Sequence, residues 1–242
     1  MARYALIGRK LGHSWSQRWF TALFQRLGLE GYTYEPHETD TLDGLRQWVE
    51  REEIAGFNVT VPYKRDILPL LDALSPEAEA IGAVNCVTVS DGRLTGHNTD
   101  SRAFSETMSP TGPALVLGTG GAARAVAYAL RQAGVDYRMV SRSPQPGTTD
   151  TIGYDEAVDF TFGKEPLTLI NATPIGMWPD VEASPWPRPE LLGRFRRVCD
   201  LVYNPSPTLL LRQAEAQGCQ VQDGLAMLHR QAELSWQLWQ RQ

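Results

Sequence analysis

The sequence predicts an α/β protein whose two halves differ in pattern. In the first half, short apolar runs typical of strands alternate with segments that carry apolar residues at helical spacing. In the second half, a short apolar run leads directly into a glycine-rich turn and a further helical pattern. The chain has 242 residues, which is long enough to build two modest domains with cores of their own.

Strands of the first half are predicted wherever short apolar runs end at turn residues; in chain order they lie at 4–8, 32–35, 57–61, 84–89 and 93–96. Ser90, Asp91 and Gly92 separate the last two strands, which predicts a hairpin. Helices are predicted between the strands, and the first of them ends at Gly28. A third helix is expected over 67–74. The apolar positions of the first two helices are Trp19, Phe20, Leu23, Phe24 and Leu27, and then Leu42, Leu45, Trp48 and Val49.

The second half begins near Gly112 and Pro113, and its first element is an apolar run at 114–117 that is typical of a buried parallel strand. A helix is expected from the glycine-rich turn to Gly134, and further strands at 137–140, 167–170 and 198–202. The proline-rich stretch 174–189 is expected to be an ordered loop. The tail from residue 224 is predicted to be helical, with one stripe formed by Leu225, Leu228, Ala232, Ser235 and Trp239.

Composition and charge argue against several classes of function. The net charge of −5 argues against general nucleic-acid binding, which usually requires a basic face. No apolar run reaches the ~18 residues of a membrane-spanning helix, and the N-terminus lacks the apolar core of a signal peptide. Cys86, Cys199 and Cys219 are odd in number and scattered, which favours a reducing, cytoplasmic location. Neither cysteines nor histidines show metal-ligand spacing, so no metal is expected. The oligomeric state is not readable from the sequence.

The glycine-rich turn matches the dinucleotide-binding fingerprint, with Gly118, Gly120 and Ala123 at the three required positions. Glycine permits the tight turn and lets a pyrophosphate approach the backbone. The helix that follows offers free N–H groups and a partial positive charge, here from Gly121 and Ala122 onward. The alternative is a glycine-rich turn that binds nothing. Because a strand precedes the turn and a helix follows it, nucleotide binding is favoured.

The end of the next strand predicts which dinucleotide binds. NAD enzymes commonly place an acidic residue there to hold the ribose hydroxyls, and NADP enzymes use arginine instead. This chain has Ser141, Arg142 and Ser143. A guanidinium can pair with the 2′-phosphate, and adjacent hydroxyls can donate to it. NADP is therefore favoured over NAD, with a simple surface arginine as the alternative.

Four short polar motifs interrupt the apolar pattern of the first half, at 13–16, 58–64, 84–85 and 98–100. Each has a structural explanation of its own, such as a helix cap or the polar side of a half-buried strand. All four lie near predicted strand ends, however, where α/β sheets place their ligand sites. Lys64 and Asp100 are the informative pair, because a lysine near a carboxylate can donate or accept a proton. Hydride exchange between an alcohol and a ketone requires one such group.

Eight motifs together resemble the shikimate dehydrogenase family, and the resemblance covers nearly the whole chain. In order they are GHSWS (12–16), GFNVTVPYK (56–64), IGAVN (81–85), GHNTD (96–100), GTGGAAR (118–124), NATPIGM (171–177), DLVYNP (200–205) and GLAMLHRQ (224–231).

The resemblance implies a two-domain α/β protein. An N-terminal substrate-binding domain would comprise 1–104 and 224–242, because the C-terminal helix returns to it, and a doubly wound Rossmann domain at 105–223 would bind NADP. Lys64 would be the catalytic acid/base with Asp100 as its partner. Ser14 and Ser16 would hold a substrate carboxylate. The remaining implied contacts are Asn58, Thr60, Asn85, Tyr203 and Gln231 for substrate, and Thr173, Met177 and Gly224 for the cofactor.

Some positions depart from the family pattern. Gln17 stands where the family usually has proline, Ser101 where it has glycine, and Cys86 where threonine is common. The family also usually has a helix with a second basic residue after the arginine at the cofactor strand. Here residues 144–149 contain two prolines and a glycine, which do not favour a helix. A clamp with one arginine should hold NADP less tightly.

The resemblance is compatible with three hypotheses about function. The main one is an NADP-linked reductase of 3-dehydroshikimate, in the biosynthesis of chorismate and the aromatic amino acids. A near alternative is a paralogue that acts on quinate, aminoshikimate or a related ring acid. A different class is a non-catalytic sensor of ligand or cofactor, but a sensor has no chemical need for the pair of Lys64 and Asp100. The presence of that pair favours an enzyme.

Overall fold

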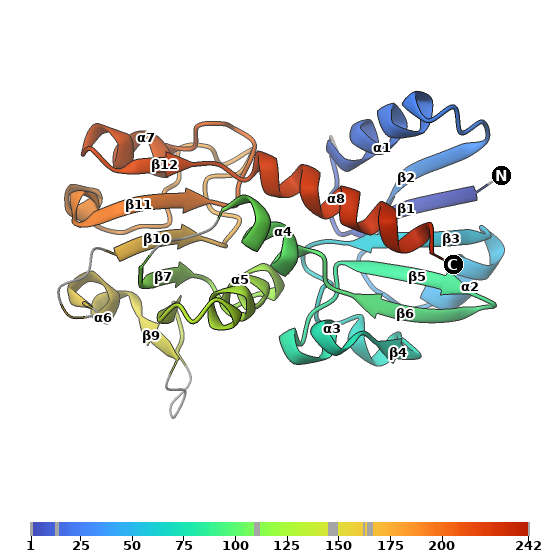
Figure 1. The fold of residues 1–242 in the computed structure, drawn as a ribbon, viewed down its shortest axis with the longest axis horizontal. Helices are drawn as coiled ribbons and strands as arrows, with labels where there is room; N and C mark the ends of the chain where they lie inside the picture. The colour runs from blue at the N-terminus through green and yellow to red at the C-terminus, as the bar shows by residue number, and fades with distance from the viewer. Residues whose placement is uncertain are drawn as a thin grey trace. The chain divides into compact units, whose positions relative to one another are not determined.

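Two six-stranded sheets organise the chain, one in each of two units (Figure 1). The computed structural model describes residues 2–12, 15–108, 112–144, 150–161, 163 and 167–241. Unit 1 consists of Met1–Thr99 and Gln231–Gln242, and unit 2 of Asp100–Arg230. The sequence-based division places its breaks a few residues away, at 104/105 and 223/224, and as a statement about functional domains it remains a prediction.

The sheet of unit 1 is mixed and has the order β2-β1-β3-β5-β6-β4. Its first three neighbours are parallel, whereas β5 runs antiparallel to β3 and to β6, and β4 runs parallel to β6. Asp91 and Gly92 both have positive φ and form the turn between β5 and β6, which confirms the predicted hairpin. The strands are β1 (Ala2–Gly8), β2 (Tyr32–Glu38), β3 (Ile54–Val59), β4 (Ala73–Leu74), β5 (Cys86–Ser90) and β6 (Arg93–His97).

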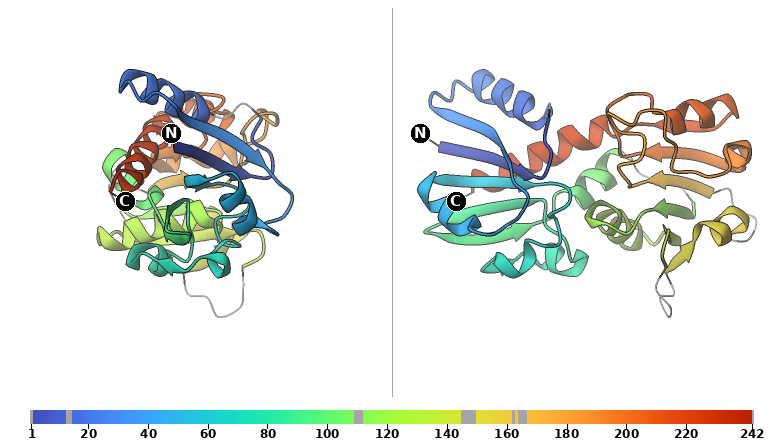
Figure 2. Two further views of the ribbon diagram at one scale, coloured as in Figure 1. Left: turned by 90° about the vertical axis from the view of Figure 1, so that its right-hand side faces the viewer. Right: turned by 180° about the vertical axis from the view of Figure 1, so that it is seen from behind.

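Alternate residues of the central strand β1 enter different cores, as the two-residue period of a strand requires. Tyr4 and Leu6 pack with aromatic residues of α1 and α8, and Ala5 and Ile7 pack with a second cluster that includes residues of α2 and α3. Figure 2 shows the helices of this unit from two further directions. They are α1 (Trp15–Arg26), α2 (Leu45–Arg51), α3 (Pro76–Ile81) and the C-terminal part of α8 (Leu225–Trp239).

The C-terminal helix is anchored to the sheet of unit 1 by Trp239. Its ring stacks on Tyr4 at 4.6 Å, and its Nε1 donates to the carbonyl of Val87 at 2.9 Å. A Cβ at Gly56 would lie 2.5 Å from that Nε1, so only glycine leaves room for the indole. Residues Gln231–Gln242 therefore belong to unit 1, and the predicted return of the C-terminal helix to the first domain is confirmed.

The sheet of unit 2 is entirely parallel, in the order β12-β11-β10-β7-β8-β9. Read from β9 and numbered within the unit, this is the order 3-2-1-4-5-6 of a doubly wound dinucleotide-binding fold. The predicted Rossmann topology is thereby confirmed. The strands are β7 (Ala114–Leu117), β8 (Tyr137–Ser141), β9 (Thr151–Gly153), β10 (Leu167–Asn171), β11 (Phe195–Asp200) and β12 (Gln220–Gln222), and the helices are α4 (Asp100–Thr107), α5 (Gly121–Gln132), α6 (Tyr154–Asp159) and α7 (Leu209–Ala216).

The prediction of a helix over 67–74 was wrong. The segment contains only a single 3₁₀ turn, η1 (Leu68–Leu70), followed by the short strand β4. Pro69 cannot donate a hydrogen bond inside a helix. The backbone N–H of Asp72 instead donates to Leu94, and the Asp72 carboxylate accepts from the Leu94 N–H at 2.7 Å. Pairing with β6 therefore takes the place of a helix.

Two smaller expectations also differ from the structure. Leu27 was expected on the buried face of the first helix, but it follows the end of α1 and is 49% exposed. The third strand ends at Val59 rather than at residue 61, and Val61 is exposed. None of the helices described by the structure is long and apolar enough to span a bilayer.

Candidate functional site

Five polar side chains from five segments of unit 1 meet in its interior. Tyr34 comes from β2, Asn58 from β3, Asn85 from the residue before β5, Thr99 from the end of the first segment of the unit, and Ser235 from α8. Each is at most 5% exposed. Buried polar groups are costly unless they are hydrogen-bonded, so their partners decide what this buried polar cluster can do.

Asn58 is the centre of the cluster. Its Nδ2 donates to the carbonyl of Asn85 at 3.0 Å and to Oγ of Ser235 at 2.9 Å. Its Oδ1 accepts from the hydroxyl of Tyr34 at 2.9 Å. Both N–H groups of the amide thus have protein partners, and an Asn58 contact with a ligand hydroxyl would use only the oxygen.

Asn85 and Thr99 are hydrogen-bonded to each other, and Thr99 is also hydrogen-bonded to Gln231 of α8. The N–H of Thr99 donates to Oδ1 of Asn85 at 2.7 Å, and Nδ2 of Asn85 donates to Oγ1 of Thr99 at 2.8 Å. Thr99 in turn donates to the carbonyl of Gln231 at 3.1 Å. The side chain of Gln231 lies 3.5 Å from Nδ2 of Asn85. The predicted substrate contacts Asn58, Asn85 and Gln231 are thus brought together.

Thr60 and Lys64 lie on the turn that follows β3. The N–H of Thr60 donates to Ile7 of β1 at 2.9 Å, and the carbonyl of Lys64 accepts from the N–H of Val84 at 2.7 Å. Tyr63 is buried between them, and its hydroxyl donates to the carbonyl of Thr39 at 2.7 Å. The turn is therefore held at both ends, and it presents Lys64 half-buried in the same unit as the polar cluster.

Ser16 is joined to the cluster through Tyr34. It is the second residue of α1, and its side chain hydrogen-bonds the hydroxyl of Tyr34. The helix-cap explanation therefore does not describe Ser16. Its predicted partner Ser14 lies outside the described residues, together with His13.

The loop before α1 is held by Glu38. One carboxylate oxygen accepts from the N–H of Leu11 at 2.6 Å and from that of Gly12 at 3.0 Å. These hydrogen bonds hold the pKa of Glu38 below its ordinary value, because they favour the charged carboxylate.

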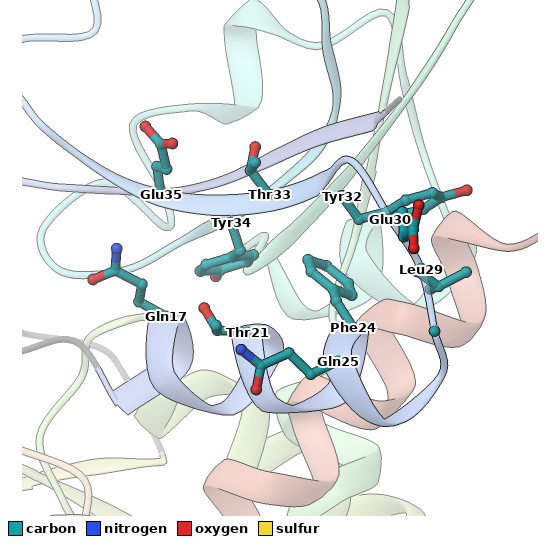
Figure 3. A pocket seen from close by; sticks show the side chains of 11 residues that line it. Gln17, Thr21, Phe24, Gln25, Leu29, Glu30, Tyr32, Thr33, Tyr34 and Glu35 are labelled. Carbon is teal, nitrogen blue, oxygen red and sulfur yellow. The ribbon is translucent and has the colours of Figure 1, made fainter.

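Two pockets of about 560 and 550 Å³ lie elsewhere on unit 1. The first, between α1 and β2, includes Gln17, Thr21 and Gln25 in its wall together with Tyr34 (Figure 3). Neither pocket is lined by a residue that was predicted to bind substrate. Among the described residues, the predicted site is recognised by its polar contacts.

In unit 2 the glycine-rich turn joins β7 to α5. Gly118 has a φ of 104°, a conformation that strongly favours glycine. Gly120 has ordinary extended angles, and a Cβ built on it would meet nothing within 4 Å. Neither backbone strain nor packing within the unit requires glycine at position 120. The open space before it, next to the uncapped start of α5, suits the close approach of a pyrophosphate to the N–H groups of Gly121 and Ala122.

Thr173 is placed beside this turn by Asn171, the last residue of β10. Oδ1 of Asn171 accepts from both the N–H and the hydroxyl of Thr173, at 3.0 and 2.7 Å. A Cβ on Gly118 would lie 3.0 Å from the Thr173 methyl group. Because β7 and β10 are the neighbours at which the strand order reverses, Thr173 lies where open α/β sheets bind their ligands.

Asp200 at the end of β11 organises the adjacent loops. Its carboxylate is fully buried and accepts from Asn171 at 2.8 Å, from the N–H of Val202 at 3.0 Å and from Thr208 at 2.7 Å. Burial raises the pKa of Asp200 to about 6, although these hydrogen bonds oppose the shift. The loop that follows carries Tyr203, which is partly buried, and burial raises the pKa of its hydroxyl.

The other predicted cofactor residues also belong to unit 2. Ser141 ends β8, its hydroxyl accepts from the N–H of Ser143 at 3.1 Å, and Arg142 between them is exposed. Met177 is 41% exposed. A Cβ on Gly224 would lie 2.1 Å from the carbonyl oxygen of Leu201, so close packing alone explains this glycine. Residues 145–149, which follow the serine–arginine–serine segment, lie outside the described part of the chain.

Lys64 and Asp100 fall in different units, since the first segment of unit 1 ends at Thr99. Asp100 is the first residue of α4 and is 4% exposed. The pairing of Lys64 with Asp100 remains a prediction, as do the roles of the individual site residues.

Residues that act through others were not predicted from the sequence. Tyr34, Thr99 and Ser235 complete the hydrogen bonds of Asn58 and Asn85, and Asn171 positions Thr173. Ser235 had a readable signal, because it is the one hydroxyl in the stripe predicted for the C-terminal helix. Tyr34 had none, since an aromatic residue on a strand is most often core.

Known proteins resemble this chain both in part and over its whole length. Residues 6–87 match the family model described as the shikimate dehydrogenase substrate binding domain. An NADP⁺-dependent shikimate dehydrogenase of Thermus thermophilus is 43% identical over 99% of this chain and 92% of its own length. The crystal structure of shikimate dehydrogenase 1 from Peptoclostridium difficile is 34% identical and covers 100% of this chain and 92% of that one, with a TM-score of 0.89. A Thermus thermophilus enzyme solved with NADP(H) and shikimate is 40% identical, with coverages of 100% and 94% and a TM-score of 0.86.

Asp200→Asn tests the buried carboxylate. The folded state holds the proton up to about pH 6, whereas an unfolded aspartate releases it near pH 4, so this group makes the free energy of unfolding fall as pH rises between these values. Asparagine does not titrate, so the variant lacks this pH-dependent contribution to stability. The difference in free energy of unfolding between the variant and wild type should therefore change by about 3 kcal/mol in favour of the variant between pH 4 and pH 7. Urea denaturation at several pH values measures the difference. The exposed Asp136→Asn variant is the control, and a constant difference for Asp200→Asn would contradict the assignment.

Gly120→Ala and Gly224→Ala form a matched pair. Alanine at 224 must displace the backbone of Leu201, and overpacking of this kind should cost about 1–3 kcal/mol of stability or more. Alanine at 120 should change stability by less than about 1 kcal/mol, but its methyl group would fill the open space before α5 and weaken dinucleotide binding. Thermal unfolding and a titration with NADP⁺ separate the two effects. A destabilised Gly120→Ala variant, or one that binds NADP⁺ normally, would show that the open space serves another purpose.

Proposed function

The chain belongs to the shikimate dehydrogenase family, and we propose that it catalyses the NADP-dependent, reversible reduction of 3-dehydroshikimate to shikimate. The observation that carries this proposal is the match over the whole chain to a relative that was solved with both NADP(H) and shikimate. The reaction belongs to the biosynthesis of chorismate and the aromatic amino acids. Residues 1–104 and 224–242 would form the substrate-binding domain, and 105–223 the NADP-binding domain.

The polar groups of unit 1 suit a polyhydroxylated ring that carries a carboxylate. Ser14 and Ser16 would donate to the carboxylate. Thr60, Asn85 and Gln231 would contact ring hydroxyls, Asn58 would contribute its oxygen, and Tyr203 of unit 2 would complete the set. Neutral donors and acceptors match such a ligand, because each ring hydroxyl left unpaired in a closed site costs about 1–3 kcal/mol.

Lys64 would carry the proton of the reaction. Reduction adds a hydride to the ketone carbon and a proton to its oxygen. The ammonium group of Lys64 can donate that proton, and in the oxidation of shikimate the neutral amine can accept it. The carboxylate of Asp100 would hold Lys64 in place. The turn of residues 60–64 is tied to Ile7 and Val84, which gives the lysine a rigid base.

The residues of unit 2 fit a dinucleotide. When bound, NADPH supplies the hydride. Gly118, Gly120, Gly121 and Ala122 would hold its pyrophosphate through their backbone, and Ser141, Arg142 and Ser143 would hold its 2′-phosphate. The remaining contacts with the cofactor would come from Thr173, Met177 and Gly224.

Supporting properties of the chain agree with a biosynthetic enzyme. Cys86, Cys199 and Cys219 are buried and form no disulfide in the described part of the chain, which supports the cytoplasm as the proposed location. The proposed partner is a small molecule, and neither nucleic acid nor a membrane is part of the proposal. A paralogue that acts on quinate or another ring acid, and a non-catalytic sensor, are the alternatives.

An assay at the reduced-nicotinamide absorbance band tests the function directly. Shikimate and quinate are each offered with NADP⁺ and with NAD⁺. The proposal requires shikimate with NADP⁺ to give the highest kcat/KM. Preference for quinate would identify the paralogue, and no turnover with any pair would favour the sensor.

Lys64→Ala should lower kcat by about 10²–10⁴-fold and change the KM for shikimate far less, as expected for loss of a general acid–base. Lys64→Arg should not restore activity, because the guanidinium stays protonated and cannot accept a proton. Arg65→Ala, which removes the exposed cation next in the chain, is the control and should keep its kcat. A near-normal kcat for Lys64→Ala would remove this residue from the mechanism.

Arg142→Ala should weaken the binding of NADP⁺ by about 1.5–3 kcal/mol, the range for a hydrogen bond to a charged group. NAD⁺ has no 2′-phosphate and should bind the variant as it binds wild type. Because Arg142 is exposed, the NADP⁺ preference of wild type should also fall as salt rises. Titration of both cofactors at two salt concentrations measures this, with the exposed Arg196→Ala as the charge-matched control. Equal losses for the two cofactors would show that Arg142 supports the fold instead.

A further inference from the structure

We propose that Tyr34 and Ser235 are positioning residues of the substrate site, which hold the amide of Asn58 in place and so align the groups that meet the substrate. Neither side chain was assigned a role in the proposed function. The inference deepens that function and rests on it, because it takes Ser16, Asn85 and Gln231 as substrate contacts. All the residues concerned belong to unit 1.

Three partners hold the Asn58 amide. Its oxygen accepts from Tyr34, and its two N–H groups donate to Ser235 and to the carbonyl of Asn85. Rotation by 180° would place an N–H against the Tyr34 hydroxyl and the oxygen against the Asn85 carbonyl. The second of these contacts has no donor and would leave buried acceptors unpaired, which is unfavourable at 5% exposure. The carbonyl of Asn85, which can only accept, therefore sets the orientation of the amide. The hydroxyls of Tyr34 and Ser235 bind its oxygen and its other N–H group and so hold the side chain in place.

Ser235 connects this amide to α8. Its side chain is fully buried, and the residue lies within the helix and not at either end. Its hydroxyl donates to the carbonyl of Gln231 at 2.9 Å, accepts from Asn58, and lies 3.4 Å from Oγ1 of Thr99. Serine that bonds back to the carbonyl four residues earlier slightly disfavours a helix, and alanine would suit the helix better. The contact with Asn58 gives a reason for a hydroxyl at this position.

The same carbonyl of Gln231 also accepts from Thr99. Thr99 is joined by two hydrogen bonds to the side chain of Asn85. Ser235 thus lies at the point where Asn58, Thr99 and the backbone of Gln231 converge. Its removal should loosen the predicted contacts Asn85 and Gln231 together.

Tyr34 connects the amide to the opposite side of the site. Its ring is 2% exposed and stacks on Phe20 of α1 at 4.2 Å with 12° between the planes. Its hydroxyl donates to Asn58 and hydrogen-bonds Ser16. The residue proposed to hold the carboxylate and the residues proposed to hold the ring hydroxyls are therefore linked through Tyr34 and Asn58. Their spacing matches one ligand only while that link is intact.

Tyr34→Phe and Ser235→Ala each remove one hydroxyl and leave the packing of the ring or the helix in place. Each should raise the KM for shikimate by roughly 5- to 30-fold, the ratio for one or two misplaced hydrogen bonds. The KM for NADP⁺ should stay within about twofold, which a general loss of folding would not allow. Tyr32→Phe, an aromatic neighbour on the same strand outside the buried polar cluster, is the matched control and should keep both KM values.

The double variant tests whether the two residues act through Asn58. If they do, its KM increase should be clearly smaller than the product of the two single increases. A multiplicative increase, an unchanged KM for shikimate in both single variants, or a parallel rise in the KM for NADP⁺ would each overturn the inference.

Exchange of the Asn58 side-chain amide with solvent, followed in ¹H–¹⁵N spectra of the ligand-free protein, gives a readout that does not depend on the reaction. Ser235→Ala removes the acceptor of one N–H and should accelerate its exchange several-fold, whereas Tyr32→Phe should not. Exchange unchanged by Ser235→Ala would overturn the inference. A wild type that does not oxidise shikimate would overturn the proposed function instead, and the exchange result would still decide whether Ser235 holds Asn58.

Discussion

The amide of Asn58 is the group on which the interior of unit 1 depends. A primary amide has two N–H groups and one oxygen, and all three find partners on different segments of the chain. Burial at 5% exposure makes each of these bonds necessary, since no water can replace a lost partner. The positions of β2, the residue before β5 and α8 are thereby tied to one side chain of β3. The groups proposed to meet the substrate inherit their spacing from that requirement.

Unit 2 meets a different constraint. Its parallel strands reverse their order between β7 and β10, so the loops after these two strands diverge and leave room for a ligand. Gly118 and Thr173 line the two sides of this divergence, and the empty volume before Gly120 opens onto the start of α5. In the proposed function, one unit would supply neutral hydrogen-bonding side chains for a polyhydroxylated ring, and the other would supply backbone N–H groups for phosphates. A dehydrogenase needs both kinds of recognition.

Glycines in the second half of the chain illustrate how the same residue type serves different ends. Gly118 is required by its dihedral angle, Gly224 by the backbone of Leu201, and Gly120 by neither. All three lie in motifs of the family, and a motif does not distinguish them. The backbone angles and packing around each position do, because they account for glycine at 118 and 224 and leave the glycine at 120 without an explanation within the fold.

Most of the fold could be read from the sequence, because the period of apolar residues is a local property. The predicted strands and the helices α1, α2, α5 and α8 were placed within a few residues, and the glycine-rich turn predicted a dinucleotide-binding unit from its context. The short strands β4, β9 and β12 and the helices α3, α4, α6 and α7 were not predicted. The segment 67–74 failed for a physical reason: its apolar composition suits a helix, but Pro69 and the pairing of Asp72 with Leu94 decide otherwise. Such pairing joins residues far apart in the chain and leaves no local pattern.

The site shows the same limit. The sequence predicts roles for Lys64, Asn58, Asn85, Asp100 and the phosphate-binding turn from their residue types and motifs, and these roles remain predictions. The tertiary structure alone decided that Tyr34, Thr99 and Ser235 complete the hydrogen bonds of Asn58 and Asn85, that Asn171 positions Thr173, and that Gly224 serves packing. A sequence states which polar groups are present. Which of them are buried, and therefore must find partners, is determined only when distant segments meet.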